Sequence, residues 1–244
     1  MTRMRVTRTR LGLLGLCAVV LGAMAFSASA AQGAATWLVN KVVLPEALLP
    51  TLGANLDGGD LSFLGTLVGI KFHILCKEIE LKETHLVAPA KVLGFMVLSK
   101  CEVLELLADS TTMVLSKCNI PEGKLTTVKM VGSIVLHEGN GAVEFKPEVG
   151  TNIMTFNMGP ECPTGENVKI GGILRIRDCV PSEFLTDKVT HLIESPKLGL
   201  NASGESNELF LNGNKKVLVT LDGSANVFLT GVAHTGLTFA GHPE

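Results

Sequence analysis

Serine is the first candidate nucleophile in this chain, because one large class of hydrolases places a serine in a Gly-x-Ser-x-Gly turn above a sheet. Ser133 and Ser224 each follow a glycine but lack the matching second glycine, and Ser203 precedes a glycine but lacks the first. We therefore interpret these serines as structural residues of turns or strands.

A cysteine nucleophile would need a histidine that converges on it in space. Cys76 lies three residues after His73, in a segment that reads as a strand. Residues at positions i and i+3 of a strand point to opposite faces of the sheet. We therefore interpret Cys76 as a buried or disulfide-bonded thiol and predict no catalytic pair.

The sequence also lacks the spacings that hold metals and phosphates. No two of the six histidines are four residues apart, and no His-x-His or His-Glu-x-x-His occurs. Asp57 and Asp60 lie outside any twelve-residue calcium loop, and Gly171–Gly172 has no phosphate-binding spacing. We predict no catalytic residue, no metal site and no cofactor, and hence a protein that is not an enzyme. The histidines are His73, His85, His137, His191, His234 and His242.

Residues 1–30 have the pattern of a secretory signal peptide. Arginines are the only charged residues before Leu11, an apolar run extends to Phe26, and small residues follow. The run is shorter than the roughly 20 residues of a spanning helix, and Ala28 and Ala30 form an Ala-x-Ala cleavage site. We predict cleavage after Ala30, with Ala31 or Ala35 as the alternatives. The mature chain is then expected to be secreted, extracellular or at the cell surface, without an integral membrane anchor.

Composition restricts the partners of the mature chain. Loss of the four signal arginines lowers the 21 basic residues to 17 against 23 acidic ones, a net charge of −6. Nucleic acid is therefore not an expected partner, and neither is anionic lipid. The chain has no tyrosine and one tryptophan, which argues against a carbohydrate-binding module or an aromatic recognition surface. A protein or surface partner remains open.

Five cysteines remain after cleavage, and outside the cytoplasm they are expected to oxidise. Because five is odd, at least one stays free or pairs between chains. The segment Val97–Cys101 recurs as Val114–Cys118 at a period of 17 residues, and Cys162 and Cys179 have the same spacing. We interpret the recurrence as a duplicated strand unit.

The common spacing suits a hairpin whose two ends are bridged, and closing such a loop contributes about 3 kcal/mol. We predict the disulfides Cys101–Cys118 and Cys162–Cys179, with Cys76 as the free thiol. The main alternative joins Cys76 to Cys101 and leaves Cys118 free.

The order of apolar runs and turns predicts an all-β fold, an antiparallel sandwich or barrel with short strands. Two segments of helical composition, 102–108 and 182–193, allow at most one or two short helices. The expected organisation is a lead-in segment, 31–60, and a single β domain, 61–244, with two packed halves near 61–137 and 138–244 as a variant. Strands are expected at 61–76, 78–82, 92–98, 112–115, 125–136, 142–145, 153–156, 168–176, 209–211, 217–221 and 227–229.

A resemblance follows from the order of these features. A cysteine ends an apolar strand at Cys76, a strand runs into Ser99–Cys101, and Cys118 precedes a Pro-Glu-Gly turn. Gly-Ser-Ile-Val-Leu at 132–136, Phe-x-Pro at 145–147 and Gly-Pro-Glu-Cys at 159–162 come next. Over roughly residues 60–240 the chain resembles a multi-copy group of secreted, cysteine-containing, β-rich bacterial proteins without an assigned function. The resemblance implies an exported β protein and brings no catalytic residues.

Three functions are compatible with these observations. The first is a secreted non-catalytic protein with a structural or partner-binding role, which explains the missing motifs and the acidic, disulfide-bonded character. The second is a β-barrel or sandwich that binds a small apolar ligand, for which the mean hydropathy of +0.38 is suitable. The third is an unrecognised extracellular hydrolase, in which acids or a histidine with a perturbed pKa would converge in a cleft.

The export prediction can be checked by the intact mass of the protein purified from culture medium, before and after reduction and thiol labelling. We expect a chain that starts at Ala31 and holds two disulfides and one free thiol. A mass that includes the signal, or five free thiols, would contradict export to an oxidising compartment.

Overall fold

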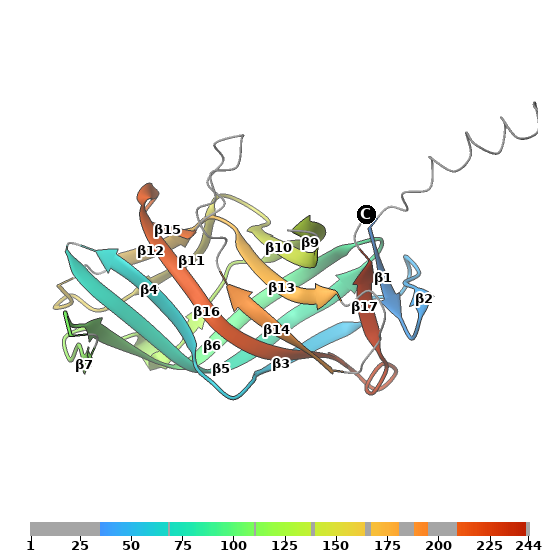
Figure 1. Ribbon diagram of the computed structural model, residues 1–244, viewed down its shortest axis with the longest axis horizontal. Coiled ribbons are helices and arrows are strands. Elements are labelled where there is room, and N and C mark those ends of the chain that lie inside the picture. The colour runs from blue at the N-terminus through green and yellow to red at the C-terminus, as the bar shows by residue number, and fades with distance from the viewer. Residues whose placement is uncertain are drawn as a thin grey trace, which may run out of the picture. The chain divides into compact units, whose positions relative to one another are not determined.

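The computed structural model describes residues 35–67, 69–109, 111–137, 140–163, 167–180, 188–194 and 209–242. The predicted signal peptide and its cleavage site at Ala28, Ala30 and Ala31 lie outside these ranges. The described chain consists of antiparallel β-sheets in a sandwich-like arrangement, with a single turn of 3₁₀-helix, η1 (Pro121–Gly123) (Figure 1). The predicted all-β class is confirmed.

Two sheets contain all the strands. A three-stranded sheet has the order β17-β1-β2, and a fourteen-stranded sheet contains the rest. The strands are β1 (Thr36–Val39), β2 (Val42–Val43), β3 (Thr51–Leu56), β4 (Leu61–Leu67), β5 (Ile70–Val87), β6 (Lys91–Leu106), β7 (Thr112–Val114), β8 (Leu125–Thr126), β9 (Met130–His137), β10 (Asn140–Pro147), β11 (Asn152–Asn157), β12 (Asn167–Gly171), β13 (Leu174–Val180), β14 (Lys188–Glu194), β15 (Leu209–Leu211), β16 (Asn214–Thr230) and β17 (Phe239–His242).

Eight strands of the large sheet close on themselves, and we call this circuit the first ring. Its order is β3, β5, β6, β9, β10, β13, β14 and β16, and β16 pairs again with β3. Every neighbouring pair is antiparallel. Because side chains alternate along a strand, Val143 and Phe145 of β10 face the inside of the ring while Glu144 faces outward, where it pairs with Arg175.

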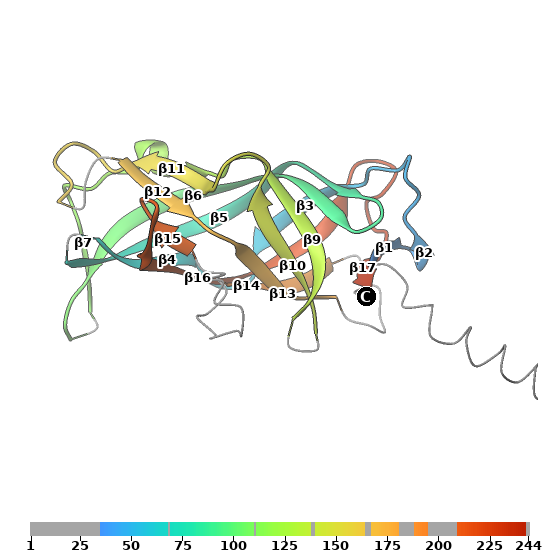
Figure 2. The same cartoon turned by 90° about the horizontal axis from the view of Figure 1, so that it is seen from above.

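The longest strands extend beyond this ring and take part in a second circuit. β4 pairs with both β5 and β16, and β15, β12 and β11 follow on the other side of β16. A bridge between Thr127 and Met154 joins β11 to the residues after β8, which pairs with β6. Figure 2 shows β11, β12 and β15 near one end of β6 and β16, with β9, β10 and β13 farther along.

β16 is one strand where the sequence predicts two with a turn at Asp222–Gly223. The pairing of β16 with β14 on one side continues through both residues, so the chain does not reverse. Gly223 has a φ of +153°, and a Cβ there would lie 2.6 Å from Leu61 Cδ1. Glycine is required at this position because β4 and β16 approach closely.

Two apolar cores occupy the two circuits. The larger, which we call the disulfide core, includes Phe63, Phe72 and the four bonded cysteines. The smaller, which we call the tryptophan core, includes Trp37, Leu86 and Phe239. Three partly buried side chains, Leu81, Phe145 and Ile176, pack against both cores. These three side chains therefore lie where the two cores meet.

Two segments whose composition allowed a helix, a strand or a loop are largely strands where the structure describes them. The segment 102–108 has helical composition but its first five residues belong to β6, where β5 pairs on one side and β7 on the other. Long-range pairing outweighs helix propensity here. Of the second helical segment, 188–193 lies in strand β14 and 182–187 lies outside the described residues. The lead-in segment also contributes three strands, β1 to β3, to the sheets.

The predicted disulfides and the free thiol are wrong. The bonds are Cys76–Cys101 and Cys118–Cys162, so Cys76 is bonded and neither predicted pair forms. Cys76 and Cys101 are directly opposite in the register of β5 and β6. The alternative pairing was correct for this first bond and wrong in leaving Cys118 free. The fifth cysteine, Cys179, is part of β13.

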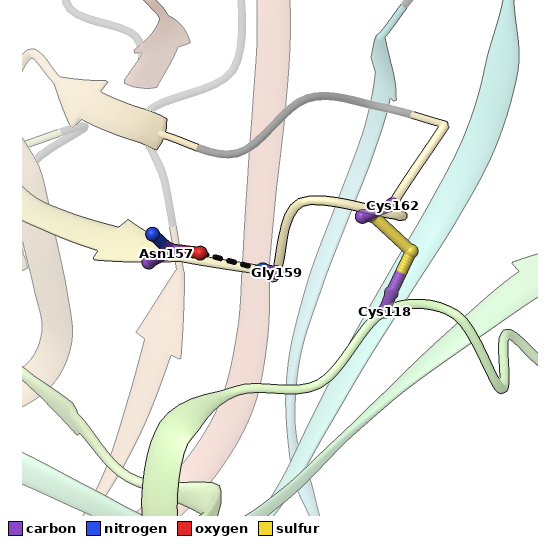
Figure 3. Close-up of a disulfide and its surroundings, with 4 residues drawn as sticks. All are labelled: Cys118, Asn157, Gly159 and Cys162. Atoms are coloured by element: carbon purple, nitrogen blue, oxygen red, sulfur yellow. Dashed lines mark hydrogen bonds between the residues drawn. A yellow bond between two sulfur atoms is a disulfide. The ribbon is translucent and has the colours of Figure 1, made fainter.

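The second disulfide joins two loops that meet after β7 and β11. The Asn119 backbone N–H donates to the Met158 carbonyl at 2.9 Å, and the Asn157 side chain accepts from the Gly159 N–H (Figure 3). Cys118 follows the end of β7, whereas Cys101 lies inside β6. The two copies of the recurring segment therefore have different structures, and the duplicated strand unit is not supported.

The second disulfide should contribute strongly to stability because it closes a separation of 44 residues. In the chain-entropy account such a loop is worth about 4 kcal/mol. We expect the variant C118S/C162S to lose about that amount of free energy of unfolding, measured by denaturant titration. The control is peptide mapping of the wild type without reduction, which should recover Cys118 joined to Cys162. Equal midpoints for the two proteins would contradict the assignment.

Candidate ligand cavity

An apolar cavity of about 80 Å³ lies inside the first ring, between the two cores. Its walls come from seven of the eight ring strands, from Thr127 and from the small sheet of β1 and β17. Because side chains alternate along a strand, most of the lining residues are every second residue of their strand, and β6 departs from this pattern at Gly94–Met96. The lining residues are Trp37, Leu52, Ala54, Ile79, Leu81, Thr84, Val92, Gly94, Phe95, Met96, Thr127, Met130, Val143, Phe145, Leu174, Ile176, Ala225, Val227 and Phe239.

The cavity offers almost no hydrogen-bonding group. Its two hydroxyl-bearing residues, Thr84 and Thr127, are both buried. Thr127 Oγ1 accepts from the Met96 backbone N–H at 2.9 Å, and Thr84 Oγ1 lies 3.1 Å from the Lys82 carbonyl oxygen. A water molecule needs two to four polar partners to stay in a cavity. Such a cavity is therefore suited to apolar atoms rather than water.

Trp37 and Phe239 form one wall of the cavity, which we call the end wall. Their ring centroids are 6.5 Å apart, and each residue is only 2% exposed. The Trp37 indole Nε1 donates to the Lys91 carbonyl at 2.8 Å, and its backbone N–H donates to the Pro89 carbonyl at 2.7 Å. These bonds hold the small sheet against the turn between β5 and β6. A Cβ at Gly241 would lie 2.9 Å from Trp37 Cζ3, so glycine makes room for the indole.

The opposite boundary of the cavity belongs to the disulfide core. Met96, Met130 and Leu174 line the cavity and are also members of that core. Both disulfides lie within the same cluster, away from the cavity lining. Cys76, Cys101, Cys118 and Cys162 therefore hold the framework on which the cavity rests, and they do not contact its contents.

Sequence reasoning did not identify the cavity residues. They are spread over nine strands, and their apolar types are those of any buried strand. The usable signals were the single tryptophan and the high aliphatic content. The way the ring closes decides which apolar residues line the cavity and which pack against one another. The sequence of a single strand does not indicate how the ring closes.

The residues considered for catalysis do not converge. His73 lies between inward-facing Phe72 and Ile74 and therefore points to the opposite face from them. Cys76 is bonded to Cys101, and Ser224 Oγ donates to the Asp57 carbonyl at 3.2 Å. No group of three or more potential metal ligands occurs among the described residues.

His73 nevertheless has an unusual environment. Its two ring nitrogens are buried and have no hydrogen-bond partner within the described ranges. Burial lowers the pKa of His73 below its usual value, and the nearby Asp60 carboxylate partly offsets this effect. Leu64 and Leu104 are its register partners on the two neighbouring strands. The environment is apolar, which favours a neutral ring.

Comparison with protein-family models, curated proteins and solved structures finds no match for this chain. In the part of the chain that the structure describes, no helix is long and apolar enough to cross a membrane. The resemblance to secreted bacterial proteins stays a prediction. The cavity is therefore the observation on which a functional argument can be based.

His73 should make stability depend on pH. Below about pH 6.5 the unfolded chain takes up a proton that the folded chain resists, so stability falls as pH decreases toward the lowered folded pKa. We expect His73→Leu to raise the free energy of unfolding by about 1 kcal/mol near neutral pH, because an unsatisfied buried group is removed. The gain should increase toward pH 5.5, as measured by denaturant titration.

The matched control is His234→Leu, in the turn before β17. It should leave stability within about 0.5 kcal/mol at both pH values. A His73→Leu gain that does not vary with pH would show that His73 keeps an ordinary pKa.

Proposed function

We propose that the mature chain is an exported, non-catalytic protein that holds the apolar end of a small molecule inside the first ring. The single observation that carries this proposal is the cavity between the two cores, whose lining offers no free polar group. The proposal favours the ligand-binding alternative among the three functions expected from sequence. A structural or partner-binding role stays a prediction.

An empty space of this size is costly to keep. Protein interiors are packed about as densely as organic crystals and contain few voids larger than a water molecule. With roughly 24 cal/mol lost per Å³, a cavity of about 80 Å³ lowers stability by about 2 kcal/mol. A bound apolar group would recover the missing contacts, which gives a ligand a favourable term on entry.

The size of the cavity restricts the ligand. An apolar cavity of about 150 Å³ holds a benzene ring, so a cavity of about 80 Å³ has room for about half as many carbon atoms. That is the end of an unbranched chain of three or four carbons rather than a fused ring system. No charged side chain is among the lining residues, so a charged group is not stabilised inside.

Export is part of the proposal and has separate support. The signal-like N-terminus precedes the described residues, and two disulfides connect the strands of the mature part. Disulfides persist in oxidising compartments. An apolar ligand would therefore be taken up outside the cytoplasm.

Binding can be tested with primary alcohols from ethanol to octanol, titrated against the fluorescence of Trp37, the only tryptophan of the chain. Each added methylene should lower Kd about fourfold, equivalent to ~0.8 kcal/mol per buried CH₂. The gain should stop near butanol, when the cavity is filled. An affinity that does not respond to chain length would contradict binding in this cavity.

A cavity-filling variant distinguishes this site from a surface site. Ala54→Leu adds three carbons at a lining position, so we expect at least a tenfold loss of butanol affinity with stability unchanged or raised. Ala108→Leu, at an exposed turn after β6, is the matched control and should bind like wild type. Equal loss in both variants would mean that butanol binds elsewhere. Isothermal titration calorimetry provides the affinities.

A further inference from the structure

One junction of the first ring is much less paired than the others. β3 pairs with β16 along its whole length, Thr51–Leu56, but with β5 only at Thr51 and His85. β4 takes over the pairing with β5 at Cys76. Between these points, residues 77–84 of β5 have no register partner in β3 or β4, although all three segments belong to the described chain. We call this junction the seam.

Local backbone geometry explains why the seam is open. The pairing of β5 with β6 shifts between Lys82 and His85, and Glu83 there has a φ of +50°. Such a bulge turns the strand and leaves an unpaired residue. On the other side, the Asn55–Asp60 segment leads the chain away from β3 and into β4, which continues along β16.

The seam borders the cavity directly. Five of the lining residues come from its two strands: Leu52 and Ala54 from β3, and Ile79, Leu81 and Thr84 from β5. Ala54 and Leu81 are only partly buried, whereas both residues of the end wall are 2% exposed. Phe145 and Ile176, on β10 and β13, are partly buried as well, so the seam differs from the other ring boundaries in its missing strand pairing.

A ligand would need to break more hydrogen bonds to enter the cavity through any boundary other than the seam. Elsewhere in the ring a ligand must separate strands joined by a ladder of backbone hydrogen bonds, each of which would be left unsatisfied. At the end wall it must displace Trp37, which donates to Pro89 and Lys91. At the seam, residues 77–84 of β5 have no strand pairing with β3 or β4 that the ligand would have to break.

We propose that the ligand enters and leaves between β3 and β5, and that it is an amphiphile whose polar end stays at the seam. This inference rests on the proposed function. The outer rim of the seam is hydrated, since Asn55, Glu80, Lys82 and Glu83 are exposed. The interior has no free partner for a polar group. One short apolar chain with a polar end therefore satisfies both environments.

The seam can be closed covalently from outside. In Asn55→Cys/Glu80→Cys, a short bis-maleimide would link two exposed positions that lie on either side of the seam and do not line the cavity. Exchange of 1-butanol would be measured by NMR. We expect the linked protein to show at least tenfold slower association and dissociation than the unlinked double variant, with Kd changed less than twofold.

The matched control is a link across a fully paired junction remote from the cavity. Thr155→Cys/Lys169→Cys joins exposed register partners of β11 and β12. This link should leave both rates unchanged. Unchanged rates in the linked seam would overturn the lateral entrance while leaving the cavity as a binding site. Absence of any butanol binding to the wild type would instead overturn the proposed function.

A second pair of variants keeps the test informative if the linked protein does not fold. Leu81→Ala shortens a side chain at the seam, and Phe239→Leu shortens one at the end wall. We expect dissociation of butanol to become several-fold faster in Leu81→Ala and to change less in Phe239→Leu, which trims a lining side chain without widening the seam. The opposite ranking would place the entrance at the end wall and refute the seam.

Discussion

The antiparallel pairing of β5, β6 and β16 is the constraint on which the rest of the structure depends. β5 and β6 pair over almost their full length, and with β16 they take part in both circuits. Each shorter strand of the large sheet is positioned by its register against one of these three or against a strand that pairs with them, apart from β11, which pairs with β12. Cys76 and Cys101 face each other in this long pair. The first disulfide therefore joins two strands that belong to both circuits.

Sharing long strands between two circuits explains why a cavity lies between the cores. The disulfide core is filled by large side chains and closed by two covalent bonds. The tryptophan core includes residues from both ends of the described chain, Trp37 of β1 and Phe239 of β17. Among the described residues, Leu81, Phe145 and Ile176 are the partly buried side chains that pack against both. A space bounded by rigid strands cannot collapse as freely as a loop region, and so the void persists.

Under the proposed function, the same geometry separates the parts that stabilise the fold from the parts that would bind the ligand. Disulfides and hydrogen-bonded ladders maintain the walls, while the cavity and the seam are made of apolar side chains and an unpaired stretch of backbone. Binding sites commonly depend on a rigid scaffold with a locally less ordered part. Here the corresponding part is a gap in strand pairing between β3 and β5.

Local sequence determined the elements that depend only on neighbouring residues. Alternation between apolar and polar side chains predicted the all-β class and most strands, including those around Ile153 and Val143. The predicted signal peptide led to the expectation that the cysteines oxidise, and four of them form two disulfides. The disulfide partners, the continuous strand through Gly223 and the cavity lining did not follow. They depend on register between segments far apart in the chain, such as Cys118 with Cys162 and Trp37 with Phe239. Alternation is a property of each strand alone, whereas register and ring closure result from the sum of long-range pairing and packing, and so only the tertiary structure decided them.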